Sequence, residues 1–222
     1  MQRLVDRAPT RRHRPASRSA TLLLTAFGPF PGVPSNQSKH LVARLAALAR
    51  QRWSRLHVAT LLLPTEWVRA PLLIEVALDR WQPDVALHFG VSGAASGFDV
   101  EWLAENRSRP LRDACGRLPE LPHLDPEAGR HMTGRRPAHQ IHRHLRQNGH
   151  SCRLSHDAGR YLCNAVYYHS LRHARLHAPD RMVAFVHIPK RLRVELHLRG
   201  AMRAVEAALA AGGPALARRL RS

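Results

Sequence analysis

Short apolar runs alternate along this chain with segments in which apolar residues recur every three or four positions. The runs have the length and composition of buried β-strands, and the periodic segments are typical of helices that cover a sheet. We expect strands at 21–26, 57–63, 84–89, 151–154 and 183–187, and helices from Asn36 or Ser38 onwards, at 67–81, at 138–147, from residue 162 onwards and at 194–211.

Long connections separate the expected strands, and this favours a mostly parallel sheet, because tight hairpins join only antiparallel neighbours. Strands that are apolar on both faces need cover on both sides, which helices can supply. We therefore predict an α/β fold, a three-layer α/β/α sandwich around a mostly parallel twisted sheet. Residues 105–136 are polar, contain prolines and lack periodicity, so we expect a long excursion with little regular structure.

The first 20 residues are basic and contain no apolar stretch. They hold six arginines and a single acidic residue, Asp6. A secretory signal needs an apolar core that this segment lacks, whereas an arginine-rich, acid-poor start also resembles an organelle transit peptide. We predict a disordered basic extension over residues 1–19 and a single α/β domain over residues 20–222.

Positive charge is the most unusual bulk property of the chain. The formal net charge is +19, and nearly all basic residues are arginines, since the lysines are Lys39 and Lys190. A charge of this size attracts nucleic acid and other polyanions by counterion release. The arginines are spread over every expected helix and loop without a nucleic-acid-binding motif, so we expect a solvated basic surface and keep polyanion binding as the alternative.

Cysteine usage and hydropathy indicate the compartment. The three cysteines, Cys115, Cys152 and Cys163, cannot all pair and are far fewer than a disulfide scaffold requires. No apolar run approaches the ~18 residues of a transmembrane helix. The histidines and cysteines also lack the paired spacing of structural zinc sites. These features predict a cytoplasmic protein without a membrane span, a metal or a cofactor.

One cysteine and one histidine stand where an α/β fold would place a nucleophile and its base. Asp157 and Gly159 mark a turn before Cys163, so this cysteine should lie in the first turn of a helix, where the macrodipole and free N–H groups stabilise a thiolate. His187 follows the apolar run 182–186 and should end a buried strand. A thiol near an imidazole suggests a cysteine hydrolase, and the alternative for Cys163 is a small core residue.

Two further features each have two interpretations. Glu101 lies among apolar residues in 98–104, so it is either an exposed acid on an edge strand, which these residues alone favour, or a partly buried carboxylate that orients an imidazole. The glycine-rich run 90–97 matches neither the P-loop nor the dinucleotide fingerprint. It is either a tight loop after a strand or a place where the backbone approaches a ligand closely.

Several segments, in the same order along the chain, resemble those of the pyroglutamyl peptidase I family, cysteine peptidase family C15. Residues 25–30 resemble the family's amino-terminal Gly-Phe-x-Pro-Phe motif, and residues 90–101 resemble the glycine loop that leads to its catalytic glutamate. Residues 155–164 resemble the Ser-Asn-x-Ala-Gly-x-Tyr-x-Cys-Asn signature of the nucleophile, and residues 185–189 resemble the Phe-Ile-His-Val-Pro segment of the catalytic histidine. The resemblance spans residues 20–212.

The resemblance implies an omega-peptidase that removes an amino-terminal pyroglutamyl residue from peptides. It implies that Cys163 forms a thioester, that His187 acts as general base and acid, and that Glu101 orients His187. The implied substrate-binding residues are Phe27, Phe30 and Val91. Members of this family often assemble as oligomers, so a homo-oligomer is implied as well.

Departures from the family pattern leave these three catalytic residues intact and concern their surroundings. Trp102 replaces the arginine that usually follows the glutamate, and Val91 stands where many members have glutamine or leucine. His156 and Asp157 replace asparagine and a small hydroxyl residue. Two alternatives therefore stay open: an amidohydrolase of the same fold with altered specificity, and a non-catalytic homologue that binds polyanions or nucleic acid.

Overall fold

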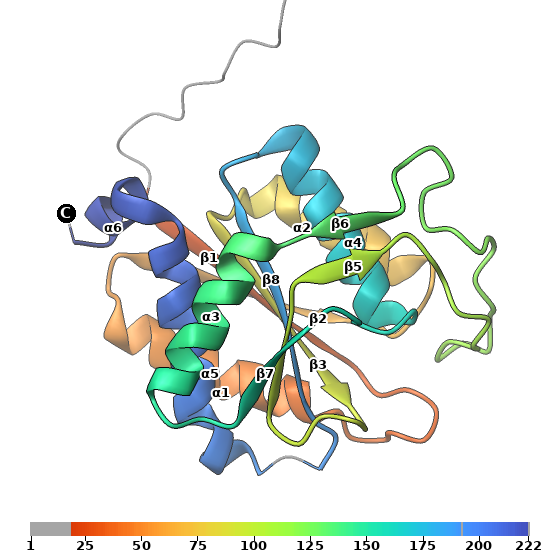
Figure 1. The fold of residues 1–222 in the computed structure, drawn as a ribbon, viewed down its shortest axis with the longest axis horizontal. Helices are drawn as coiled ribbons and strands as arrows, with labels where there is room; N and C mark the ends of the chain where they lie inside the picture. Colours follow the sequence, from red (N-terminus) through yellow and green to blue (C-terminus); the bar gives the residue numbers. More distant parts are fainter. Residues whose placement is uncertain (1–18, 192, 222) are drawn as a thin grey trace, which may run out of the picture.

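The computed structural model describes residues 19–191 and 193–221, which form three layers around a central sheet (Figure 1). Six strands make this sheet in the order β2-β1-β3-β8-β4-β7. They are β1 (Ala20–Phe27), β2 (Leu56–Leu63), β3 (Val85–Ser92), β4 (Phe98–Glu101), β7 (Cys152–Ser155) and β8 (Met182–Pro189). The predicted α/β sandwich with a mostly parallel sheet is confirmed. The basic extension predicted over residues 1–19 lies outside the described residues, except for Ser19.

Helices cover both faces of the sheet. One face packs against α1 (Gln37–Arg52), α3 (Arg135–Gln147), α5 (Val194–Ala211) and α6 (Gly213–Arg221), and the other against α2 (Arg69–Trp81) and α4 (Leu162–His177). All eight residues of β1 are buried, which explains why this strand is a continuous apolar run and does not alternate. Of the two expected caps of α1, Asn36 is the cap, and its side chain accepts a hydrogen bond from the Ser38 amide at 3.2 Å.

Two neighbouring strands, β4 and β7, run opposite to the other four, which the sequence pattern did not predict. β1, β2, β3 and β8 are parallel, whereas β4 pairs with β8 in the antiparallel sense. β4 has only four residues, all of them buried, and lies inside the sheet between β8 and β7. The interpretation of Glu101 as an exposed acid on an edge strand is therefore wrong.

A small second sheet joins the two ends of the polar segment between residues 105 and 131. β5 (Leu103–Glu105) pairs with β6 (His131–Thr133) in the antiparallel sense. Between them, residues 106–130 contain neither helix nor strand. The prediction of little regular structure over 105–136 is thus confirmed for most of that range, although α3 already begins at Arg135.

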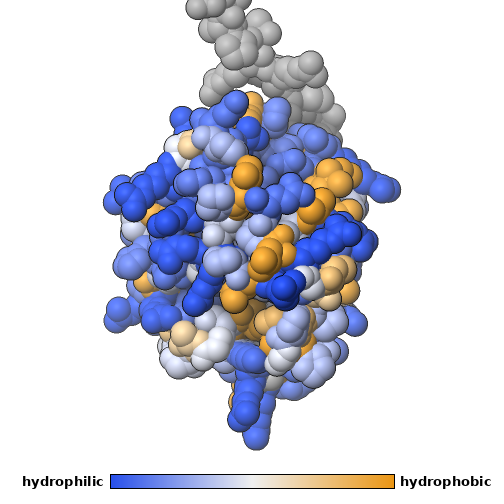
Figure 2. Space-filling model, turned by 90° about the vertical axis from the view of Figure 1, so that its right-hand side faces the viewer, coloured by the Kyte–Doolittle hydropathy of each residue, from blue (hydrophilic) through white to orange (hydrophobic). Residues whose placement is uncertain are grey.

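Polar side chains cover most of the molecular surface on the face shown in Figure 2, and apolar side chains form a broken band between them. Single exposed apolar residues are normal for a soluble protein, so this face is typical of a solvated surface. In the part of the chain that the structure describes, no helix combines the length and the apolar character needed to cross a bilayer.

A fully buried histidine in β3, His88, should make the stability of the fold sensitive to acid. His88 forms a 2.9 Å hydrogen bond between its Nδ1 and the hydroxyl of Thr25, and burial lowers the pKa of His88 to about 3. An unfolded histidine titrates near 6.5, so below that pH the unfolded state binds a proton that the folded state does not. From this residue we expect the free energy of unfolding to fall by up to about 1.4 kcal/mol per pH unit between pH 6 and pH 4.

Urea unfolding of the wild type and of His88→Leu across this pH range measures the effect of His88. Leucine removes the titration and is of similar size, so the variant's free energy of unfolding should depend less steeply on pH than that of the wild type. Equal slopes for the two proteins would contradict the prediction.

Candidate active site

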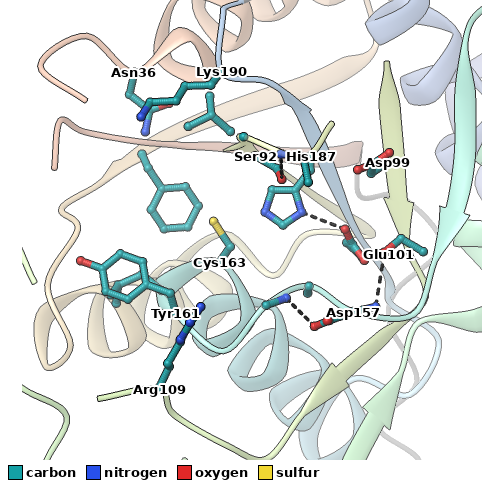
Figure 3. A pocket seen from close by; sticks show the side chains of 18 of the residues that line it. Asn36, Ser92, Asp99, Glu101, Arg109, Asp157, Tyr161, Cys163, His187 and Lys190 are labelled. Atoms are coloured by element: carbon teal, nitrogen blue, oxygen red, sulfur yellow. Dashed lines mark hydrogen bonds and ion pairs between the residues drawn. The ribbon is translucent and has the colours of Figure 1, made fainter. Parts of the chain in front are cut away.

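A cavity of about 660 Å³ opens at the carboxyl ends of β1, β3 and β8 (Figure 3). All six residues that the sequence predicted for the site line it: Cys163, His187, Glu101, Phe27, Phe30 and Val91. They come from segments far apart in the chain, since β1, β3, β4 and β8 each contribute to the cavity together with α4. The structure therefore brings the predicted site residues together in one place.

Cys163 is the second residue of α4, so its sulfur lies near the positive end of a sixteen-residue helix. The helix begins at Leu162, where the sequence pattern predicted it. Asp157 is not its cap: the carboxylate accepts a hydrogen bond from the Gly159 amide at 2.9 Å, and Gly159, with φ of +72°, turns the chain before the helix starts. In the described part of the chain no side chain caps α4, so the amides of its first turn remain available to an anion.

His187 and Glu101 form a buried pair at the base of the cavity. His187 Nδ1 lies 2.8 Å from Glu101 Oε1, and the two residues are 6% and 1% exposed. The antiparallel pairing of β4 with β8 places Glu101 opposite Phe185, two residues before His187. A hydrogen bond at Nδ1 fixes the ring, so Nε2 is the nitrogen left for the cavity.

The pKa of His187 results from opposing effects. Burial disfavours the imidazolium, but the negative charge and hydrogen bonding of Cys163, together with the bond to Glu101, outweigh burial and raise the pKa of His187 to about 10. Figure 3 shows the sulfur of Cys163 beside the imidazole ring. At neutral pH this pKa keeps His187 protonated, so an imidazolium lies next to the Cys163 sulfur.

Aromatic rings form one wall of the cavity. Phe30 lies 6.3 Å from Tyr161 between ring centroids, and Tyr161 packs edge-on against Trp67 at 5.2 Å. The hydroxyl of Tyr161 donates to the carbonyl oxygen of Arg112 at 3.0 Å, and burial raises the pKa of Tyr161 to about 12, so it stays protonated. The sequence analysis did not name Tyr161 as a site residue. It stands two residues before Cys163 in the segment 155–164 that resembles the family's nucleophile signature, which could have pointed to it.

Charged and polar residues that the sequence analysis did not select complete the lining. Arg153 holds Asp99 with two bonds of 2.7 Å each, which neutralises this acid at the cavity edge. The others include Asn36, Thr65, Arg109 and Lys190. No sequence signal distinguishes Arg109 and Lys190 from the other members of a set of 35 basic residues. Across residues 19–191 and 193–221, no cluster of three or more potential metal ligands occurs.

The departures from the family pattern fall in two different places. Val91, His156 and Asp157 line the cavity, so they can contact a substrate. Trp102 lies outside the cavity lining and packs against the core, with the guanidinium of Arg135 above its ring at 5.6 Å. A change of specificity would therefore arise from the first three residues and not from direct contact with Trp102.

Gly90, the first residue of the glycine-rich run, lies in β3 and leaves room for the sulfur of Cys163. A Cβ at this position would lie 2.8 Å from the Cys163 sulfur and 2.9 Å from the Phe185 ring, so the backbone must approach the thiol here. We expect Gly90→Ala to displace the thiol and to slow its alkylation by iodoacetamide about tenfold.

The matched control is Gly129→Ala, because nothing lies within 4 Å of a Cβ at that glycine. Second-order rate constants for alkylation at pH 7, measured by mass spectrometry of the peptide that contains Cys163, compare the two variants. The prediction fails if both variants react at the wild-type rate.

Comparisons with known proteins agree with this geometry. A family model described as pyroglutamyl peptidase (peptidase C15) matches residues 20–201. The pyrrolidone-carboxylate peptidase of Gloeobacter violaceus is 31% identical over 170 residues, and that of Pyrococcus furiosus is 28% identical over 169 residues; each alignment covers 76% of this chain and 80% of the relative. The solved structure of a mutant pyrrolidone carboxyl peptidase from Pyrococcus furiosus superposes with a TM-score of 0.73 at 26% identity, covering 85% of this chain and 98% of that one. This chain belongs to the pyroglutamyl peptidase family.

Proposed function

We propose that this protein is a cysteine peptidase that hydrolyses the amide bond after an amino-terminal pyroglutamyl residue. The observation that carries the proposal is the group of Cys163, His187 and Glu101 inside a cavity with an aromatic wall. Membership of the pyroglutamyl peptidase family supports the same reaction, since the relatives are named for pyrrolidone carboxylate, the product that such a reaction releases.

The first chemical step is acylation of the enzyme. The Cys163 thiolate attacks the pyroglutamyl carbonyl carbon, and the C–N bond to the peptide breaks as the thioester forms. The proton already held by His187 passes to the leaving nitrogen, so the peptide departs as a neutral amine. Glu101 keeps the imidazole ring in place and stabilises its positive charge before the transfer.

The second step is hydrolysis of the thioester. His187, now neutral, takes a proton from water as the water attacks the thioester carbonyl. Collapse of the intermediate breaks the C–S bond and restores the thiolate beside the imidazolium. The amides of the first turn of α4, which no described side chain caps, are placed to stabilise the oxyanion in both steps.

The cavity suits a small, neutral ring. A pyroglutamyl group has no free α-amine, so its pocket needs no carboxylate to pair with an ammonium. Phe27, Phe30 and Tyr161 offer aromatic surface to the ring, and Val91 adds apolar surface next to the catalytic histidine's strand. The lactam amide then needs only a few polar partners, for which Asn36 and backbone groups of the wall are available.

A direct assay tests the function. Purified protein should release the fluorophore from a pyroglutamyl amide, and pretreatment with iodoacetamide should abolish the release. The matched control substrate is the prolyl amide, which has the same ring size but carries a charged amine and no lactam carbonyl; we expect it to be cleaved at least about tenfold more slowly. Absence both of turnover and of thiol alkylation at neutral pH would contradict the proposal.

A second candidate is an amidohydrolase of the same fold with a different amino-terminal preference. The observation that favours it is the place of Val91 and His156 in the cavity lining, since both depart from the family pattern. A panel of blocked and unblocked aminoacyl amides separates the two candidates: faster cleavage of another amide than of the pyroglutamyl amide would favour the second.

Three further predictions concern the surroundings of the enzyme. They are a cytoplasmic location, a homo-oligomeric state and, as the less favoured alternative to a solvated surface, polyanion or nucleic-acid binding through the net charge of +19. A salt series with duplex DNA tests the last of these, because counterion release makes such binding weaken steeply with salt.

A further inference from the structure

The helix that carries the nucleophile also carries two buried side chains that bind the segment containing the catalytic acid. The first is Asn164, which directly follows Cys163 and is fully buried. Its amide nitrogen donates to the carbonyl oxygens of Glu105 at 2.8 Å and Arg107 at 3.1 Å, and its amide oxygen accepts from the Glu105 amide at 2.8 Å. One side chain thus joins the first turn of α4 to β5, which begins two residues after Glu101.

The second side chain is Tyr167, one helical turn after Cys163 and also fully buried. Its hydroxyl donates to the backbone carbonyl oxygen of Glu101 at 3.0 Å. Burial, followed by the charge of Glu101, raises the pKa of Tyr167 well above its ordinary value, so the hydroxyl remains a donor. Gly134 closes the space around it, because a Cβ there would lie 2.2 Å from the hydroxyl oxygen.

These bonds matter because the catalytic residues come from different layers. Glu101 and His187 belong to the sheet, whereas Cys163 belongs to a helix that packs on one face of it. Apolar packing alone permits small shifts between such layers, and a shift of about 1 Å can cost two orders of magnitude in rate. β4 is only four residues long, so its own ladder offers few bonds with which to hold Glu101 in place.

We propose that Asn164 and Tyr167 are positioning residues, which fix the nucleophile helix to the Glu101 segment so that the thiol stays within reach of the imidazole. Neither residue lines the cavity or touches the reacting atoms. The inference rests on the function proposed above for its kinetic readout, but the reactivity of the thiol can be measured without any peptide substrate.

The main test is Asn164→Ala, because alanine removes all three bonds without placing a new charge beside the thiolate. We expect kcat for the pyroglutamyl amide to fall roughly 10²-fold while KM changes less than about threefold, since Asn164 does not line the cavity. The ratio of the Cys163 alkylation rate at pH 6 to that at pH 9 should fall at least about fivefold, because displacing the sulfur from the neighbouring imidazolium removes the group that activates it at low pH.

The structure offers a closely matched control in Asn106. This asparagine is also buried, and its side chain also makes three backbone bonds: it donates to Asp125 at 2.6 Å and to Ala128 at 3.2 Å, and accepts from the Asp125 amide at 2.8 Å. These bonds stay within the excursion and do not reach α4. Asn106→Ala should therefore lower the melting temperature to a similar extent while keeping the wild-type alkylation ratio and most of kcat.

Tyr167→Phe provides the second variant, which keeps the ring and removes only the hydroxyl. We expect a smaller fall in the same direction, about tenfold in kcat, since one bond is lost and not three. If Asn164→Ala does not fold, this variant decides the question alone. Wild-type kcat and a wild-type alkylation ratio in the folded variants, or an Asn106→Ala protein with the same altered ratio, would overturn the proposal.

The two readouts separate this inference from the proposed function. If the wild type cleaves no pyroglutamyl amide but the alkylation ratio still differs between the wild type and Asn164→Ala, the positioning role holds and the substrate assignment is wrong. If the wild type cleaves the amide and the ratio is the same in both proteins, the function holds and the positioning role is wrong.

Discussion

Replacing Cys163 with alanine should lower kcat/KM for a pyroglutamyl amide by at least about 10⁴-fold. The sulfur is the only described cysteine side chain in the cavity, and without it no thioester can form. The folded state should be little affected, because the cysteine is half-buried in the cavity wall and its side chain is small. Steady-state rates and a thermal melt of the purified variant test both parts of this expectation.

Cys115→Ala is the control for this experiment. Cys115 is an exposed cysteine outside the cavity lining, so its removal should leave turnover unchanged. A Cys163→Ala protein that keeps a tenth or more of the wild-type rate would show that another group performs the chemistry. Loss of activity in both variants would point to a general effect of thiol removal and not to a nucleophile.

Glu101→Gln should lower kcat by about 10³-fold, although the fold and the shape of the side chain are kept. Glu101 is one of the groups that raise the pKa of His187, and glutamine supplies neither its charge nor an acceptor of equal strength. The pKa of His187 must then fall, so the imidazolium loses its proton at a lower pH than in the wild type. The basic limb of the pH–rate profile should accordingly move to lower pH.

The profile of kcat/KM between pH 5 and pH 10 measures this shift. Glu105→Gln is the matched control: it removes a carboxylate that pairs with Arg160 at 2.7 Å in an exposed setting, where an ion pair contributes about 0–1 kcal/mol to stability. That variant should keep the wild-type profile. An unchanged basic limb in Glu101→Gln would contradict the role assigned to the acid.

The long elements of the fold could be predicted because each follows one dominant physical pattern. β1 and β8 are continuous apolar runs since both of their faces are buried, and α5 shows helical periodicity over its whole length, so its predicted bounds agree with the structure. Short elements gave no such signal. β4 is four residues long, and nothing in those residues reveals that it inserts between β8 and β7 in the antiparallel sense to β8.

The site residues divide in the same way: some could be recognised from their neighbours in sequence, and others depend on distant parts of the chain. Cys163 could be recognised from the glycine turn and helix start around it, and His187 from the strand that it ends. The burial of Glu101 depends on the neighbours of β4, which are 54 and more residues away in sequence, so its own residues wrongly indicated an exposed acid. The resemblance to a known family favoured the other interpretation, a carboxylate that orients an imidazole, and the structure places Glu101 next to His187. Tyr161, Arg109 and Lys190 reach the cavity through the fold, and composition alone could not distinguish them.

The open position of Cys163, the proposed nucleophile, has a consequence for oxidation. The cavity leaves Cys163 half-buried and in reach of solvent, while its imidazole and acid partners are almost fully covered. A cysteine that is open to solvent and lies next to an imidazolium is a target for peroxide, which gives a sulfenic acid that thiols can reduce and, with more oxidant, a sulfinic acid that they cannot. The proposed role of this sulfur in amide cleavage therefore implies that activity depends on the reducing capacity of the protein's surroundings.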